Sequence, residues 1–126
     1  MIWRWAMLFL AGTAAADEVT VPPLLCGGVE PSWTMTIEEK RGSYATPDRP
    51  DPVLYDIPLI TKAEGRPWPR VVTLIGRGDT ALAILDERQC TDTMSDLTYP
   101  FEATLLTQRG SEAIALTGCC RLKPDG

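Results

Sequence analysis

The chain has 126 residues, with 17 acidic and 12 basic side chains, a formal net charge of −5 and no histidine. This length allows one domain, and the acidic balance argues against nucleic acid as a partner, because nucleic acid requires a basic binding face. The lack of histidine excludes Ser-His-Asp and Cys-His catalytic groups and the zinc sites that use histidine. No glycine-rich phosphate loop lies between a strand and a helix, so we expect no cofactor.

The first 16 residues have the order of a secretory signal peptide. A short start containing Arg4 precedes an apolar run over residues 6–11, and Ala14-Ala15-Ala16 supplies small residues before Asp17. This order predicts cleavage after Ala16 and a periplasmic location. A retained membrane anchor is the alternative, although the run is shorter than the roughly 20 residues that cross a bilayer. Cleavage leaves no membrane span and changes the net charge from −5 to −6, because Arg4 is the only charged side chain removed.

Residues 17–126 form the predicted single domain, and they contain Cys26, Cys90, Cys119 and Cys120. An even number of cysteines in an exported chain predicts two disulfides, for which three pairings exist. Neighbouring residues of a strand point to opposite faces, so Cys119 and Cys120 should meet different partners. We favour Cys90–Cys119 and Cys26–Cys120, although the sequence alone does not choose between the pairings that remain.

Alternating apolar residues predict the first strands of this domain. Trp33, Met35 and Ile37 share one face of a strand, and residues 53–61 alternate in the same way. Within that second segment Pro58 favours a sheet edge or a bulge. Residues 46–52 contain three prolines and are expected to form the longest loop, because proline lacks a backbone donor.

Two hairpins are predicted in the second half of the chain. Residues 71–75 and 81–85 flank a turn at 76–79, and residues 99–107 and 113–117 flank a turn at 108–111. No window has the period of an amphipathic helix. The sequence therefore predicts an all-β fold, a small antiparallel up-and-down barrel of seven or eight strands stapled by disulfides. Whether residues 17–25 form a strand or a tail stays open.

The polar segment after the first hairpin could carry chemistry. Asp86, Glu87, Asp92 and Asp96 surround Cys90, so hydrolysis by paired carboxylates is one alternative, and it requires a cleft between two acids. Loose calcium binding through oxygen atoms is another. Cys90 and Met94 could bind copper, but disulfide formation is the stronger expectation for the thiol. We therefore expect a protein that is not an enzyme and holds no metal.

Three parts of the chain resemble a family of small bacterial periplasmic and lipoprotein domains. They are Cys26-Gly27-Gly28-Val29-Glu30-Pro31-Ser32-Trp33, the segment Cys90-Thr91-Asp92-Thr93-Met94-Ser95-Asp96-Leu97-Thr98-Tyr99-Pro100, and Leu116-Thr117-Gly118-Cys119-Cys120. The family has a Cys-x-Asp-x-Met-Ser-Asp-x-x-Tyr-Pro centre, and Ser32 stands where it often has Phe. The resemblance implies export and fold, and it carries no activity.

The chain is also loosely similar to the barrel inhibitors of C-type lysozyme, which plug the enzyme's cleft with a loop containing Ser and Tyr. This similarity would give that role to Ser95 and Tyr99, and a net charge of −6 would suit a cationic partner. The Ser-Gly-x-x-Tyr pattern of those inhibitors is missing here, so the similarity concerns the fold.

The candidate binding residues lie mainly in the middle motif. The acidic and hydroxyl side chains could instead order the loop by accepting backbone N–H bonds, and Trp68 suits either recognition or a lid on the barrel. The binding set comprises Asp92, Met94, Ser95, Asp96, Tyr99 and Trp68. The leading hypothesis is an exported binding or inhibitory module for a cationic protein or a small ligand. The alternatives are a structural or stress-related envelope protein without a specific pocket, and a hydrolase that uses carboxylates.

Overall fold

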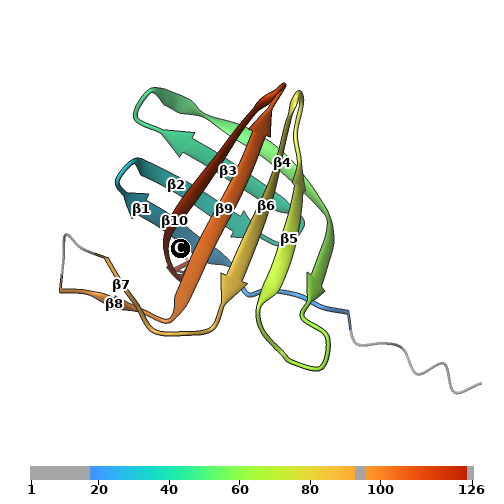
Figure 1. The fold of residues 1–126 in the computed structure, drawn as a ribbon, viewed down its shortest axis with the longest axis vertical. Helices are drawn as coiled ribbons and strands as arrows, with labels where there is room; N and C mark the ends of the chain where they lie inside the picture. The colour runs from blue at the N-terminus through green and yellow to red at the C-terminus, as the bar shows by residue number, and fades with distance from the viewer. Residues whose placement is uncertain (1–17, 93–95, 125–126) are drawn as a thin grey trace, which may run out of the picture.

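The computed structural model describes residues 18–92 and 96–124, and strands are the only regular elements in this part of the chain. Eight strands form a closed barrel (Figure 1). They are β1 (Leu24–Val29), β2 (Ser32–Glu38), β3 (Arg41–Thr46), β4 (Arg49–Lys62), β5 (Arg70–Ile75), β6 (Asp79–Asp86), β9 (Phe101–Arg109) and β10 (Glu112–Leu122). The predicted all-β barrel is confirmed.

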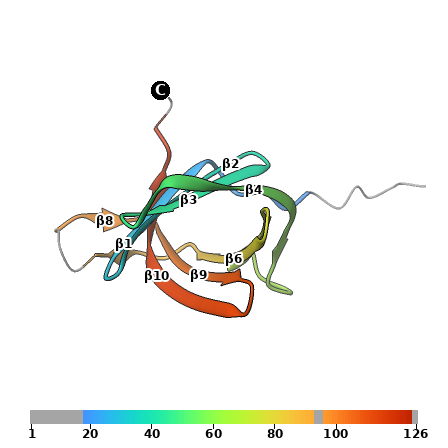
Figure 2. The same ribbon diagram turned by 90° about the horizontal axis from the view of Figure 1, so that it is seen from above.

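The barrel is an antiparallel meander with one insertion. Each strand pairs with the next in the chain, except that β6 pairs directly with β9. The residues between them include a two-stranded ribbon, β7 (Cys90–Thr91) and β8 (Thr98–Tyr99), which projects from the barrel wall (Figures 1 and 2). Pairing of β1 with β10 closes the barrel. The open question about the N-terminal stretch is thus answered in part, because strand structure begins at Leu24.

Alternation along each strand fills the barrel interior. Trp33, Met35 and Ile37 are at most 2% exposed, which confirms the predicted inward face of β2. Leu74 and Leu105, from opposite parts of the chain, are equally buried in the same cluster. Burial of one face therefore specifies the register of the strands, since a slip of one residue would turn this face to solvent.

The prediction of a long proline-rich loop over residues 46–52 is wrong. Only residues 47–48 form a turn, and β4 starts at Arg49 and includes Pro50 and Pro52. A register shift between Tyr44 and Thr46 leaves residues 50–52 without paired residues in β3, and the pairing of β4 with β5 starts only at Asp56. The prolines therefore interrupt no ladder. Further along β4, Pro58 lies at the second register shift, between Asp56 and Leu59, as the bulge alternative predicted.

Both favoured disulfides are present. Cys26 and Cys120 lie opposite each other in the β1–β10 pairing, with 4.0 Å between their Cα atoms, and their bond lies in the core. Cys119 points outward and bonds Cys90 of the ribbon, at a Cα–Cα distance of 5.7 Å. Two disulfides indicate an oxidising, exported environment. Within the described residues no helix has the length and hydrophobicity to span a membrane.

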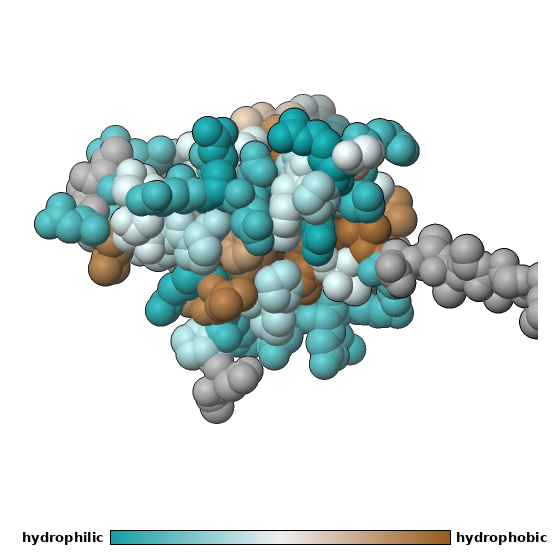
Figure 3. All heavy atoms as spheres, turned by 90° about the horizontal axis from the view of Figure 1, so that it is seen from below, coloured by the Kyte–Doolittle hydropathy of each residue, from teal (hydrophilic) through white to brown (hydrophobic). Residues whose placement is uncertain are grey.

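The barrel has two different ends. The turns at residues 30–31, 47–48, 76–78 and 110–111 surround one end, which we call the mouth. The connection from β4 to β5 lies at the opposite, closed end, where Trp68 packs against Phe101 with 5.4 Å between ring centroids. Figure 3 views the molecule from this side and shows mostly hydrophilic residues with small separate hydrophobic areas.

Candidate functional site

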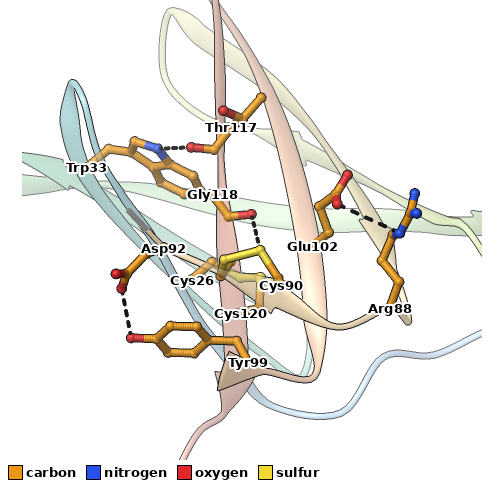
Figure 4. Close-up of a disulfide and its surroundings, with 11 residues drawn as sticks. Cys26, Trp33, Arg88, Cys90, Asp92, Tyr99, Glu102, Thr117, Gly118 and Cys120 are labelled. Atoms are coloured by element: carbon orange, nitrogen blue, oxygen red, sulfur yellow. Dashed lines mark hydrogen bonds and ion pairs between the residues drawn. A yellow bond between two sulfur atoms is a disulfide. The ribbon is translucent and has the colours of Figure 1, made fainter. Parts of the chain in front are cut away.

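The ribbon that carries the middle motif is tied to the outside of the barrel. In β7 and β8, Cys90 pairs with Tyr99, and the Tyr99 hydroxyl donates a hydrogen bond to Oδ2 of Asp92 at 3.2 Å (Figure 4). Sγ of Cys90 lies 3.5 Å from the Gly118 carbonyl oxygen, a contact without a proton because the sulfur is in a disulfide. The disulfide and these contacts order the base of the ribbon.

The structure brings together only part of the predicted binding set. Asp92 and Tyr99 are in contact, and Asp96 lies exposed in the segment between the two short strands. Met94 and Ser95 lie outside the described residues. Trp68 is part-buried against the core, with the Arg70 guanidinium 4.3 Å from its ring centroid. This packing is compatible with a lid on the closed end, and the choice between a lid and a recognition residue stays a prediction.

Two hollows flank the ribbon. One, of about 460 Å³, lies between residues 27–30 of β1 and its turn, Cys90–Asp92 and residues 117–119 of β10. The other, of about 230 Å³, is lined by β1, Tyr99 and Arg121 among others. Both lie on the outside of the barrel wall, where a small ligand would remain largely in solvent.

A third cavity lies inside the barrel, at the mouth, and has a volume of about 480 Å³. Part of the lining is apolar and is formed by Trp33, Ile114 and Leu116. The rest, which we call the polar wall, includes Tyr44, Tyr55 and Thr107 and the charged residues Asp48, Arg49, Asp79, Arg109 and Glu112. These side chains come from β3, β4, β6, β9, β10 and the turn between β3 and β4. The volume is in the range of small-molecule sites, which combine apolar walls with a few polar groups.

Asp79 is the charged residue that lies deepest in this polar wall. It is 9% exposed and is the one buried charged residue in the described part of the chain. It lies opposite Arg109 in the β6–β9 pairing, and Oδ1 of Asp79 is 3.3 Å from Nε of Arg109. A buried carboxylate requires such a partner, because desolvation disfavours its charge. Asp79 is thereby neutralised from within the barrel.

The two tyrosines of the polar wall remain protonated at neutral pH. Burial and the nearby Asp79 carboxylate, with a smaller contribution from Tyr44, raise the pKa of Tyr55 to about 12, against the opposing effects of Arg49 and Arg109. Burial raises the pKa of Tyr44 as well, and the Arg49 guanidinium opposes this shift. Both phenols are therefore hydrogen-bond donors over the whole physiological range.

Trp33 gives the cavity its apolar floor. Its Nε1 donates to the Thr117 carbonyl at 3.1 Å, so the polar atom of the indole is already bonded. A Cβ on Gly28 would lie 2.4 Å from that nitrogen, and a Cβ on Gly118 would lie 2.1 Å from the Gly27 carbonyl oxygen. Close approach of β1, β2 and β10 thus explains the glycines of the outer two motifs. Gly28 and Gly118, which belong to two of the resemblance motifs, thus leave the space that the Trp33 side chain occupies below the cavity.

Sequence reasoning missed the mouth cavity almost entirely. Tyr44, Arg49 and Asp79 belonged to a short strand, a presumed loop and a hairpin turn, and nothing local connects them. The one available signal was the placement of tyrosines and charges in phase with inward-facing positions. Among the described residues no group of three or more cysteine, aspartate or glutamate side chains is arranged to hold a metal ion.

No protein-family model matches the chain, and neither a curated protein nor a solved structure does.

Proposed function

We propose that the protein is an exported, non-enzymatic binding module that holds a small amphipathic ligand in the mouth cavity. The signal peptide cleaved after Ala16 would deliver residues 17–126 to the periplasm. The observation that carries the proposal is the cavity of about 480 Å³, which combines apolar and polar lining inside a closed barrel.

The surroundings of the cavity support this role. Its floor is formed by Trp33, which is 2% exposed and is held by a hydrogen bond to β10. Ile114 is 45% exposed although it lies on the inward side of β10, so its side chain remains open to an entering molecule. A preformed site of this kind loses little conformational entropy on binding.

The test uses oxidised residues 17–126 and three ligands that share one ring system: 2-naphthoate, 2-naphthalenemethanol and 2-naphthylmethylammonium. Amide chemical shifts in NMR spectra report where each one binds. We expect shifts at residues of the mouth, with the largest near Trp33 and Ile114. The ribbon and the closed end should change little.

A pair of variants in β10 provides the control. Ile114→Trp places a large side chain in the mouth, whereas Ala115→Trp adds the same side chain to the exposed outer face of the next residue. Binding should be lost in the first variant and kept in the second. If no ligand shifts the mouth residues, or if both variants bind equally, a ligand site in this cavity is ruled out.

A second candidate function is binding of a protein partner through the ribbon, as in the inhibitory hypothesis. The observation in its favour is that the ribbon projects from the wall (Figure 2). Leu97, in the segment between its two strands, is 61% exposed. A pull-down from envelope extract with residues 17–126 as bait tests it. Leu97→Ser should remove such a partner, and Leu54→Ser, which changes a leucine 70% exposed on β4, should not. A partner retained by both variants would contradict a ribbon site.

The remaining alternatives predict different results. A structural or stress-related envelope protein would bind none of the three ligands and no partner, and its absence would weaken the envelope. A hydrolase would require activity that disappears when Asp86, Glu87, Asp92 or Asp96 is changed to the amide. These experiments distinguish a binding module from a structural protein and from a hydrolase.

A further inference from the structure

The two arginines of the mouth differ in their partners. Arg109 is paired with Asp79, at 3.3 Å. Arg49 lines the same cavity as Tyr44 and Tyr55, and its charge opposes the rise in the pKa of both phenols. No carboxylate of the described residues lies within 4.0 Å of the Arg49 nitrogens. Of the two arginines that line the cavity, Arg49 is therefore the one without an ion pair among the described residues, although Asp48 and Glu112 line the same cavity.

Arg49 is well placed for this role by the local backbone. It follows the two-residue turn between β3 and β4, and its backbone N–H donates to Oγ1 of Thr46 at 3.2 Å. The pairing of Thr46 with Arg49 sets the start of β4 against the end of β3. The residue is thus anchored through its main chain, which leaves the side chain to contact a ligand.

The phenols add donors beside this cation. Tyr55 is 3% exposed, and its hydroxyl makes no hydrogen bond with any described residue. Among these residues no fully buried side-chain oxygen or nitrogen lacks a partner, so the Tyr55 hydroxyl must reach the cavity surface. A protonated phenol can donate to an oxyanion, and the Arg49 guanidinium can bind the same group with two parallel N–H bonds.

We infer that the mouth cavity binds a small amphipathic anion, whose oxyanion group contacts Arg49 and Tyr55 and whose apolar part lies on Trp33, Ile114 and Leu116. This inference rests on the proposed function and assigns the chemical class of its ligand. A carboxylate is the simplest such group, because its two oxygens match the guanidinium.

A cationic ligand is the opposite possibility, since the whole chain is acidic. Asp48 and Glu112 also line the cavity, but both are exposed, whereas the one buried carboxylate of the lining, Asp79, already has Arg109 as its partner. An anion at Arg49 would meet a guanidinium that forms no ion pair with the described residues. Close, partly buried charges outweigh the distant net charge, because exposed charges beyond a Debye length of about 8 Å are screened at physiological salt.

The experiment compares the dissociation constants of 2-naphthoate, 2-naphthalenemethanol and 2-naphthylmethylammonium, measured by calorimetry with oxidised residues 17–126. We expect naphthoate to bind about 10-fold more tightly than the alcohol, the size of effect typical of a charge-assisted hydrogen bond. The ammonium compound should bind more weakly than both.

Variants of Arg49 assign the preference to one side chain. Arg49→Gln should remove the preference, so that naphthoate and the alcohol bind equally, and the amide NMR spectrum of the variant shows whether it is folded. Arg49→Lys should keep part of the preference. Arg66→Gln, which removes the same charge from the β4–β5 connection at the closed end, should have no effect.

The outcomes separate this inference from the function on which it rests. If the alcohol or the ammonium compound binds at the mouth as tightly as naphthoate, the cavity is a ligand site but the anionic class is wrong. The same holds if Arg49→Gln leaves the preference intact. If none of the three compounds binds at the mouth, the proposed function fails, and the inference fails with it.

Discussion

The closed end and the mouth of the barrel are built from the same strands but filled with different chemistry. At the closed end the interior contains Leu24, Leu85, Phe101 and the Cys26–Cys120 disulfide, all at most 6% exposed. At the mouth the inward positions hold tyrosines, an ion pair and a free arginine around a cavity. The difference indicates a division of labour, in which one end supplies stability and the other is available for binding.

The sharpest test of this division is removal of the core disulfide. Cys26→Ala/Cys120→Ala opens a cross-link over 94 residues and should lower the free energy of unfolding by up to about 4.7 kcal/mol in the chain-entropy model. Urea unfolding of the variant and of the wild type measures the change. Cys90→Ala/Cys119→Ala, with a separation of 29 residues, should cost up to about 3.5 kcal/mol and act mainly on the ribbon. A larger loss from the second pair would contradict the assignment of barrel closure to Cys26–Cys120.

The seam between β1 and β10 should also be sensitive to one methyl group. Gly118→Ala would place a Cβ 2.1 Å from the Gly27 carbonyl oxygen, and since that atom is backbone the strands must move apart. We expect a loss of about 1–3 kcal/mol, as for other overpacked interiors. Thr117→Ala, on the exposed outer face of the adjacent position, should change stability by less than about 0.5 kcal/mol. Equal effects of the two variants would mean that a Cβ at position 118 fits between β1 and β10 without moving the strands.

Alkaline titration of the tyrosines should detect the raised pKa of Tyr55 in the polar wall. Because burial and Asp79 raise the pKa of Tyr55 to about 12, the folded protein keeps this proton while the unfolded chain loses it near pH 10. Stability from this group is complete below pH 10 and is lost as the pH rises to about 12. Absorbance of tyrosinate at 295 nm should contain a late phase that Tyr55→Phe removes. If that phase survives the substitution, Tyr55 is not the buried phenol.

The smallest effect concerns the ribbon. Tyr99→Phe removes the hydrogen bond to Asp92, which should cost about 1 kcal/mol or less. The loss should be local, so hydrogen exchange of residues 90–92 and 97–99 should accelerate while the barrel strands remain protected. Thr98→Ala, at an exposed neighbouring position, serves as the control. Faster exchange throughout β9 and β10 would show that the ribbon stabilises the barrel wall.

Local patterns were sufficient for much of the fold. The hairpin turns contain Gly78 and Gly110 with positive φ, a conformation that glycine adopts without strain, so their positions could be read from composition. Alternation revealed the inward face of β2, and the opposite orientation of adjacent residues separated the partners of Cys119 and Cys120. Each of these features depends on residues that are close together in the chain.

The features that the sequence did not predict depend on contacts between residues that are far apart in the chain. Residues 50–52 look like loop residues because of their prolines, yet β4 runs through them where neither neighbouring strand is paired. The recognition role of the ribbon motif stays a prediction, since Asp92 and Tyr99 are in contact but Met94 and Ser95 lie outside the described residues. The cavity residues carry no shared local motif at all.

Amino-acid order alone thus specified the strand alternation, the turns and the requirement for separate cysteine partners, because these follow from backbone geometry over a few residues. Barrel closure decided the rest. Pairing of β1 with β10 and of β6 with β9 brings Tyr44, Tyr55 and Asp79 around one opening, although these side chains lie on three different strands. These residues form one candidate site only because closure of the barrel places the strands that carry them around a common interior.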